Sequence, residues 1–185
     1  YSYTDQSNYL RGRVRIYKWN NTSWNNIGTI DGEDKNSNSG YSTSLSDDGT
    51  ILAIGAPYND GGGTGYGAGH VRVYDYIEGR SPEWDQLGSD IEGEAAYNLG
   101  GGCVSLNSNG TILAIGAKYN DVNTSNTNDN TGHVRVYEYT NNDWQKIGDD
   151  IDGQSQGDYF GGSVSLSDNG TILAIGADLN SGTGN

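Results

Sequence analysis

Fifteen residues occur three times in nearly the same form, and this repetition limits what the chain can fold into. The copies are STSLSDDGTILAIGA at 42–56, CVSLNSNGTILAIGA at 103–117 and SVSLSDNGTILAIGA at 163–177. Within each copy, two short runs of β-forming residues flank a dipeptide that tolerates the positive φ angles of a type I′ turn. These dipeptides are Asp48-Gly49, Asn109-Gly110 and Asn169-Gly170. Each copy therefore predicts a tight β-hairpin.

A longer unit of about sixty residues contains this hairpin. Trp24, Trp84 and Trp144 are spaced 60 residues apart. A strand-like segment of the type RVRIYKW recurs at 13–19, 70–76 and 133–139, and a second one runs from each Trp to an Ile that precedes an acidic residue and Gly. The four consecutive apolar residues ILAI indicate a strand buried on both faces. One unit thus predicts four short antiparallel strands, with no helical periodicity.

Four-stranded units of this length, placed side by side, are typical of a β-propeller. The fold class predicted is all-β, with about three blades' worth in one segment, 1–185, and with repeat units at roughly 13–69, 70–132 and 133–185. The order of strands splits one blade between the two ends of the sequence. Because propellers have about 4 to 8 blades, we expect further residues of a longer chain, or a second copy, to complete the ring.

Charge and composition exclude several classes of protein. The chain has 24 Asp and Glu against 10 Lys and Arg, a net charge of −14 that repels nucleic acid and anionic lipid. No apolar run is long enough to cross a membrane. The single Cys103 takes the position of Ser42 and Ser163, which suggests a packed small residue. Since the sequence contains no Met, we expect a processed chain or a piece of a longer one.

The hairpin phrase followed by GHVRVYEY at 132–139 resembles the FG-GAP repeats of integrin α-type propellers. Phe160-Gly161 matches the Phe-Gly element of that family, and Ile54-Gly55-Ala56-Pro57 matches its Gly-Ala-Pro element. WD-repeat and tectonin-like blades resemble the sequence less. The FG-GAP resemblance implies a non-enzymatic, extracellular or cell- or virion-surface module for adhesion or scaffolding.

Calcium binding, which the resemblance implies for some FG-GAP blades, is not predicted here. The hairpin turns SDDGT, NSNGT and SDNGT are too short to supply the six to eight oxygen ligands that Ca²⁺ requires. A weaker alternative for Ca²⁺ lies in two oxygen-rich loops, at Asn59, Asp60, Asn120 and Asp121. No other cofactor is expected.

One arginine recurs on the same strand of every unit, and one acid recurs after the second strand. A partly buried guanidinium needs an anionic partner. We therefore expect a structural ion pair in each unit, formed by Arg15, Arg72 and Arg135 with Asp31, Glu92 and Asp152.

Histidine and tryptophan patterns favour packing over chemistry. His70 and His133 show no metal-ligand spacing and are expected to be partly buried strand residues. The three recurring Trp residues begin the outermost strand, where packing is favoured over a sugar-stacking role. The glycosylation motif Asn-x-Ser/Thr occurs in loose loops at Asn20, Asn21 and Asn123.

No arrangement of residues in the sequence indicates catalysis, since there is neither a Ser/His/Asp pattern nor a His cluster. The prediction is a non-enzymatic interaction or scaffold module that binds a protein partner or a second copy. A carbohydrate-binding, lectin-like propeller is the alternative, and an enzyme with a site in the channel is the weakest reading.

Overall fold

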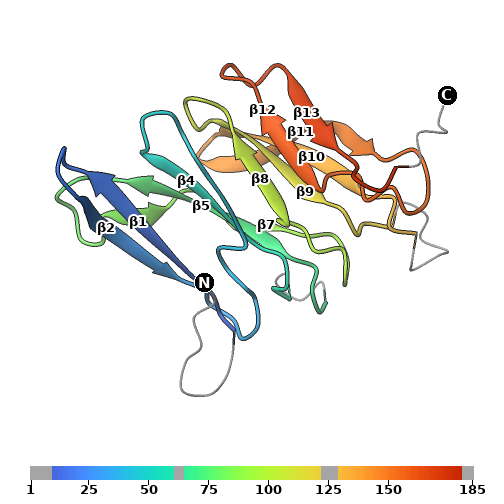
Figure 1. The fold of residues 1–185 in the computed structure, drawn as a ribbon, viewed down its shortest axis with the longest axis horizontal. Helices are drawn as coiled ribbons and strands as arrows, with labels where there is room; N and C mark the ends of the chain where they lie inside the picture. The colour runs from blue at the N-terminus through green and yellow to red at the C-terminus, as the bar shows by residue number, and fades with distance from the viewer. Residues whose placement is uncertain (1–9, 61–64, 122–128, 181–185) are drawn as a thin grey trace.

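A computed structural model describes residues 10–60, 65–121 and 129–180. These residues form thirteen β-strands and no helix (Figure 1). The all-β prediction is therefore confirmed for the part of the chain that the structure describes. Within those same residues there is no helix long and apolar enough to cross a membrane.

The strands form four antiparallel sheets, which we number I to IV in chain order. Sheet I contains β1 (Arg13–Trp19) and β2 (Trp24–Asp31). Sheet II has the order β3 (Ser42–Leu45), β4 (Ile51–Ala56), β5 (His70–Tyr76), β6 (Trp84–Gln86), and β7 (Ile91–Glu92) also pairs with β5. Sheet III has the order β8 (Cys103–Leu106), β9 (Ile112–Ala117), β10 (His133–Thr140), β11 (Asp143–Asp152). Sheet IV contains β12 (Ser163–Leu166) and β13 (Leu173–Gly176).

Hairpins form at all three copies of the fifteen-residue repeat, but their turns differ from the predicted type. Among the turn residues only Gly49, Gly110 and Gly170 have positive φ angles, of 71°, 70° and 71°. A type I′ turn would require the preceding residue to have positive φ as well. Asp48 instead accepts hydrogen bonds through Oδ1 from the backbone N (3.0 Å) and hydroxyl (2.8 Å) of Thr50. This local bonding replaces the strained backbone that a two-residue turn would need.

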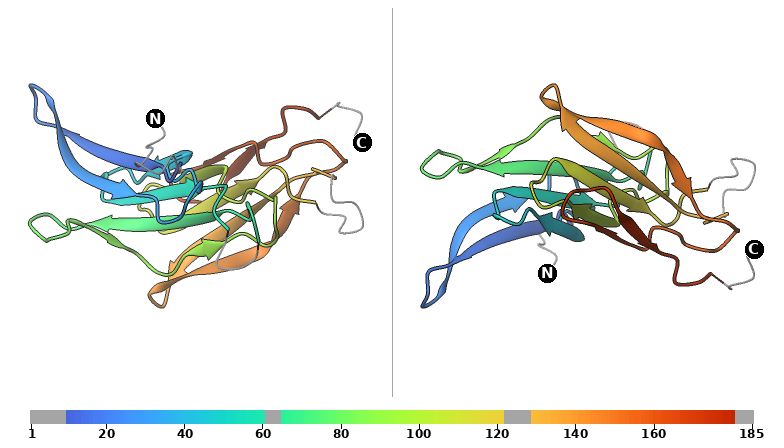
Figure 2. Two further views of the ribbon diagram at one scale, coloured as in Figure 1. Left: turned by 90° about the horizontal axis from the view of Figure 1, so that it is seen from below. Right: turned by 90° about the horizontal axis from the view of Figure 1, so that it is seen from above.

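Sheets lie one beside the next in chain order, with sheets I and IV at opposite ends of the molecule (Figures 1 and 2). The first strands of sheets II, III and IV are β3, β8 and β12. Strand β8 lies beside both β3 and β12, and side chains join it to each of them. The backbone N of Leu106 donates to Ser44 Oγ (2.9 Å), and that of Leu166 donates to Ser105 Oγ (3.0 Å). The serines of the repeat thus hydrogen-bond sheet II to sheet III and sheet III to sheet IV.

Apolar side chains fill the spaces between the sheets. From their second residue on, β4 and β9 are buried, as the ILAI run predicts. Trp84 packs with Ile16 of sheet I, and Trp144 Nε1 donates to the carbonyl of Leu87 in sheet II (2.9 Å). Both of these Trp residues are 7% exposed, whereas Trp24 is 67% exposed. Packing between sheets, and not a sugar-stacking surface, therefore accounts for Trp84 and Trp144.

Candidate functional site

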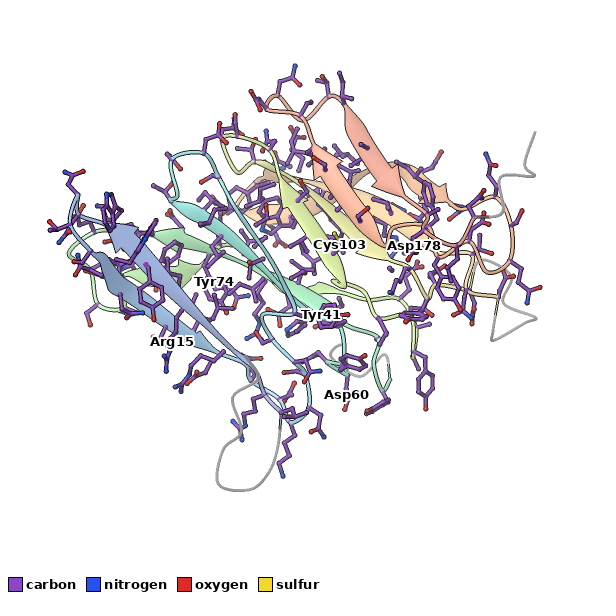
Figure 3. All side chains as sticks on the ribbon, in the orientation of Figure 1. Arg15, Tyr41, Asp60, Tyr74, Cys103 and Asp178 are labelled. Atoms are coloured by element: carbon purple, nitrogen blue, oxygen red, sulfur yellow. The ribbon has the colours of Figure 1, made fainter. Side chains whose placement is uncertain are left out.

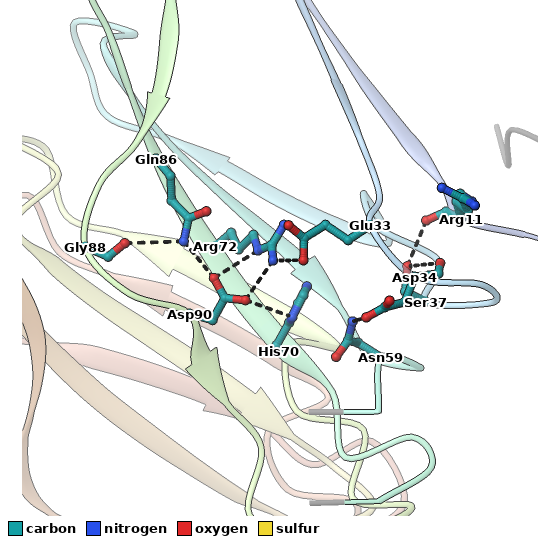
Figure 4. A network of polar contacts seen from close by, with 10 residues as sticks. All are labelled: Arg11, Glu33, Asp34, Ser37, Asn59, His70, Arg72, Gln86, Gly88 and Asp90. Atoms are coloured by element: carbon teal, nitrogen blue, oxygen red, sulfur yellow. Dashed lines mark hydrogen bonds and ion pairs between the residues drawn. The ribbon is translucent and has the colours of Figure 1, made fainter. Parts of the chain in front are cut away.

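Arg72 lies at the centre of a polar network between sheets I and II (Figure 4). Its Nε donates to Asp90 Oδ1 (3.0 Å) and its Nη2 to Asp90 Oδ2 (2.8 Å). The same Nη2 forms an ion pair with Glu33, in the segment after β2. His70, which is 5% exposed, has its Nδ1 3.7 Å from Asp90 Oδ2. The guanidinium therefore links acids from two neighbouring sheets.

Sheets II and III are joined by the same arrangement. Arg135 Nε and Nη2 donate to the two carboxylate oxygens of Asp150, at 3.0 and 2.7 Å, and Arg135 also pairs with Glu94. His133 is again 5% exposed, with Nδ1 3.8 Å from Asp150 Oδ2. The network occurs both between sheets I and II and between sheets II and III. Its main role is therefore to hold neighbouring sheets together.

The arginines therefore do not bind the acids predicted from the sequence. In the antiparallel register, His70 lies opposite Glu92, and His133 lies opposite Asp152. Counting two residues along from each pair puts Arg72 opposite Asp90 and Arg135 opposite Asp150. In sheet I, Asp31 lies opposite Arg13, whose Nη2 donates to it (2.9 Å).

Arg15 differs from the other two arginines. It lies opposite Thr29, is exposed, and has no ion-pair partner among the described residues. The sequence-based prediction chose Asp31, Glu92 and Asp152 as the arginine partners because an acid occurs at this position in all three units. The useful signal is strand register, which selects Asp90 and Asp150 and shows that the first unit has Thr29 in their place.

Charge states follow from these contacts. Burial has the largest single effect on Asp90 and acts to raise its pKa, but hydrogen bonds from Arg72 and Gln86, together with the charge of Arg72, hold that pKa below its ordinary value. Hydrogen bonds from Arg135 likewise lower the pKa of Asp150. Burial lowers the pKa of both His70 and His133. At neutral pH Asp90 and Asp150 are therefore charged, and both histidines are neutral.

Two groups in these networks are close enough to hold a metal ion: His70 with Asp90 and Glu92, and His133 with Glu94 and Asp150. In each group, however, an arginine already donates to both oxygens of the central Asp. The guanidinium thus supplies the positive charge that a metal would bring.

The oxygen-rich loops named as the weaker Ca²⁺ alternative lie elsewhere. Asn59 is 3% exposed and donates through Nδ2 to Asp34 Oδ2 (3.0 Å), while Asp121 Oδ1 accepts from the backbone N of Asn130 (2.9 Å). Asp60 is exposed and Asn120 is buried. These four residues are thus divided between internal hydrogen bonds and solvent. Among the predicted glycosylation sites, Asn20 and Asn21 are exposed in the turn after β1, and Asn123 lies outside the described residues.

A groove of about 830 Å³ opens among the loops that connect the strands of sheets II and III, near the loop end where Figure 3 labels Tyr41 and Asp60. Four tyrosines, two alanines, Leu99 and three polar residues line it. The tyrosines are Tyr58, Tyr66, Tyr97 and Tyr119. Its volume falls in the range of about 300–1,000 Å³ that is usual for small-molecule sites.

Tyr97 is held in an unfavourable backbone conformation at this groove. Its φ is 68°, in the left-handed region, where a bulky residue costs about 1–2 kcal/mol. The corresponding residues of the other units, Asn36 and Gly157, tolerate this conformation. The Tyr97 side chain is 68% exposed, and its ring centroid lies 5.8 Å from that of Tyr66. Strain that keeps an aromatic ring at the surface points to a binding role.

Asp121 is the one carboxylate among the residues that line the groove. It follows β9, and the backbone N of Asn130 donates to its Oδ1. The tyrosine rings offer faces for stacking on a sugar-like ring, and Asp121 can accept a hydrogen bond or a proton. The hairpin repeat does not predict this groove, because the other units have Asn36 and Gly157 at the position of Tyr97, and the third unit has Asp129 at the position of Tyr66. Such departures from the repeat are the signal that could have revealed it.

No protein-family model matches the sequence, and no curated protein matches it. The solved structures that share this fold include candidate 6-phosphogluconolactonases from Bacteroides fragilis and Bacteroides uniformis. The first has a TM-score of 0.54 at 16% identity, and the second has a TM-score of 0.55 at 12% identity. Each match covers 91% of this chain, but the chain spans only 37% and 42% of the length of those proteins.

These findings correct the predicted relationship to FG-GAP repeats. The Phe-Gly and Gly-Ala phrases reflect close sheet packing: a Cβ on Gly116 would lie 2.1 Å from the carbonyl oxygen of Gly161. Glycines at such a contact are a requirement of packing and do not identify a family. The predicted non-enzymatic adhesion or scaffold module rested on that resemblance and is contradicted, since the two solved structures are named as candidate enzymes, while the extracellular or surface location stays a prediction. Neither structure supports the lectin-like alternative.

Proposed function

We propose that this chain is part of a β-propeller, and that the groove lined by Tyr66, Tyr97 and Asp121 hydrolyses an uncharged sugar lactone. The strained, exposed Tyr97 is the observation that carries the proposal, because a ring maintained at an energetic cost is best explained by a ligand that stacks on it. The names of the two structural neighbours supply the class of reaction.

Hydrolysis of a lactone needs an activated water and a bound ring. In the proposed reaction Asp121 accepts a proton from water, and the water oxygen attacks the lactone carbonyl carbon. The bond between that carbon and the ring oxygen then breaks, and the proton passes from Asp121 to the ring oxygen. The product is the open-chain hydroxy acid. Tyr66 and Tyr97 hold the sugar ring beside Asp121.

Charge favours a substrate without phosphate. The whole chain has a net charge of −14, and neither Lys nor Arg lines the groove. A phosphorylated lactone would therefore meet net repulsion from the acidic chain, and the nearby cation is Lys118, whose Nζ lies 5.0 Å from the ring centroid of Tyr119. We expect glucono-1,5-lactone to be hydrolysed faster than its 6-phosphate at low salt, with a smaller difference at about 0.15 M salt, where the Debye length is about 8 Å.

The test measures proton release from glucono-1,5-lactone, with the uncatalysed rate subtracted. Asp121→Asn should lower the catalysed rate by at least about 100-fold, the usual contribution of a general base. The matched control is Asp60→Asn, at the corresponding position after β4, which lies outside the groove. A chain that does not exceed the uncatalysed rate would overturn the proposal, and so would equal rates for the two variants.

Tyr97→Asn separates binding from structure. Asn is the residue of the first unit at this position and tolerates the left-handed backbone. We expect the variant to be at least as stable as the parent protein while its KM for the lactone rises. A loss of stability with unchanged kinetics would show that Tyr97 has only a structural role.

A further inference from the structure

Identical residues are buried in sheets II and III and more exposed in sheet IV. LAIG is buried throughout in β4 and β9, but in β13 it is partly buried with Ala174 exposed. Ile172, just before β13, is 70% exposed. At the other end of the molecule, Leu45 of β3 is 50% exposed, whereas its counterpart Leu106 is 7% exposed. Sheet IV and strand β3 of sheet II therefore present surface that the repeat normally buries.

Each end sheet also has a strand edge that the repeat normally pairs. β4 pairs with β5, and β9 pairs with β10. Among the described residues, β13 pairs only with β12, and β1 pairs only with β2. Since β1 corresponds to β5 and β13 to β4, the two free edges are the ones that the repeat joins. They lie near opposite ends of the molecule, as the labels of Arg15 and Asp178 show (Figure 3).

We propose that two copies of this chain associate head to tail, with β13 of one copy pairing antiparallel with β1 of the other. The register between β4 and β5 places Gly55 opposite Val71 and Ala53 opposite Val73. The same register would place Gly176 opposite the second copy's Val14 and Ala174 opposite its Ile16. Four strands would then form one sheet from two chains.

A contact between an isoleucine and a glycine supports this arrangement. A Cβ on Gly110 would lie within 3 Å of Ile51 in the preceding sheet, and a Cβ on Gly170 would lie 2.6 Å from Ile112. Gly49 has no described atom within 4 Å of its Cβ position. In the proposed pair, the exposed Ile172 of one copy packs on Gly49 of the other.

Polar groups repeat the same pattern. Ser44 and Ser105 each accept from the next sheet, so Ser165 Oγ would accept from the backbone N of Leu45 in the second copy. Glu33 and Glu94 pair with the arginine of the next sheet, Arg72 and Arg135. The third unit has Gln154 at this position, which would face the second copy's Arg15.

Two is the number of copies that fits a ring. The described residues of each copy form sheets II and III and two half-sheets, so the described residues of two copies make six sheets. One copy closing on itself would give three, and three copies would give nine, while propellers have about 4 to 8 blades. Head-to-tail contacts form closed rings when the rotation allows it. This inference does not depend on the proposed lactone chemistry, because it concerns other residues.

Light scattering over a range of concentrations tests the association. The chain has a mass of 19.7 kDa, so the expected complex is about twice that mass. Ile172→Asp should raise the dissociation constant at least about 30-fold, as expected for a central contact. Ile77→Asp is the control: Ile77 is 39% exposed but lies outside the proposed contact. A parent chain that stays monomeric, or a dimer that Ile172→Asp leaves intact, would overturn the proposal.

Gln154→Glu is a second, gain-of-function test. It restores the residue that the first two units have at this position, so it should tighten association several-fold through a new ion pair with Arg15. The gain should vanish in an Arg15→Gln background. Gln145→Glu adds the same charge on exposed β11 and should not tighten association. Equal effects of the two glutamates would contradict the predicted contact.

Discussion

At the residue scale, the arginine networks show that position in a strand ladder decides which charges meet. Arg72 and Arg135 bind Asp90 and Asp150 because these acids lie two residues before Glu92 and Asp152, which pair with the histidines two residues before the arginines. Arg15 has the same place in the repeat but Thr29 opposite it. The protein thus contains an internal comparison between a paired and an unpaired arginine at equivalent positions.

Arg135→Met should lower the free energy of unfolding by about 3 kcal/mol, because it leaves Glu94 without its cation, and Asp150 with only Lys146, in a partly buried site. Arg15→Met is the matched control and should change stability by less than about 0.5 kcal/mol, since surface substitutions usually do. Urea-induced unfolding measures both. Equal losses for the two variants would show that the network contributes little.

At the scale of elements, glycine sets how closely the sheets approach. Gly55 and Gly116 lie in the buried strands β4 and β9, where a Cβ would meet the carbonyl oxygens of Gly101 and Gly161 at 2.0 and 2.1 Å. Backbone cannot move away from such a contact without separating the sheets. These strands therefore have Gly between Ile and Ala because a side chain at this position would collide with the backbone of the neighbouring sheet. The backbone conformation of the strands themselves does not require Gly.

Gly116→Ala should therefore destabilise the protein by about 3 kcal/mol through overpacking. Gly148→Ala is the control: Gly148 has a φ of 71° and no atom within 4 Å of its Cβ position, so only the backbone cost of about 1 kcal/mol applies. Thermal unfolding followed by tryptophan fluorescence compares them. If Gly148→Ala proved the more damaging variant, close sheet packing would not be the main constraint.

At the scale of the whole molecule, stability should depend on pH through the two histidines, which are the only ones in the chain. Burial lowers the pKa of His70 and His133 from an ordinary value near 6.5. The unfolded chain then binds more protons than the folded chain as the pH falls below about 6.5. Each histidine accordingly contributes stability above that pH, which is lost on acidification.

Between pH 7.5 and 5.5 the parent protein should lose up to about 2 kcal/mol more unfolding free energy than the His70→Gln/His133→Gln double variant. Comparing the two proteins cancels the general effect of the net negative charge, which is common to both. Urea unfolding at a series of pH values gives the two slopes. Parallel pH profiles would show that the histidines are not held neutral in the folded state.

Much of the fold could be predicted from the sequence because its determinants are local. Alternating polarity, the Asp-Gly or Asn-Gly dipeptides and the ILAI run each act within a few residues and produce the hairpins and the buried β4 and β9. The candidate site could not be predicted in this way. Tyr66 and Tyr97 are 31 residues apart, and only the loop geometry brings their rings together.

By itself, the sequence determined the strands, their hairpins and the sixty-residue period, because side-chain alternation and turn preference are properties of neighbouring residues. Only the tertiary structure decided the partners of the arginines, the tyrosine-lined groove and the exposure of identical residues. The segment LAIG is buried in β4 and β9 but only partly buried in β13, although its amino-acid sequence is identical in the three strands. Burial depends on which strand and which sheet lie alongside, and no residue carries that information alone.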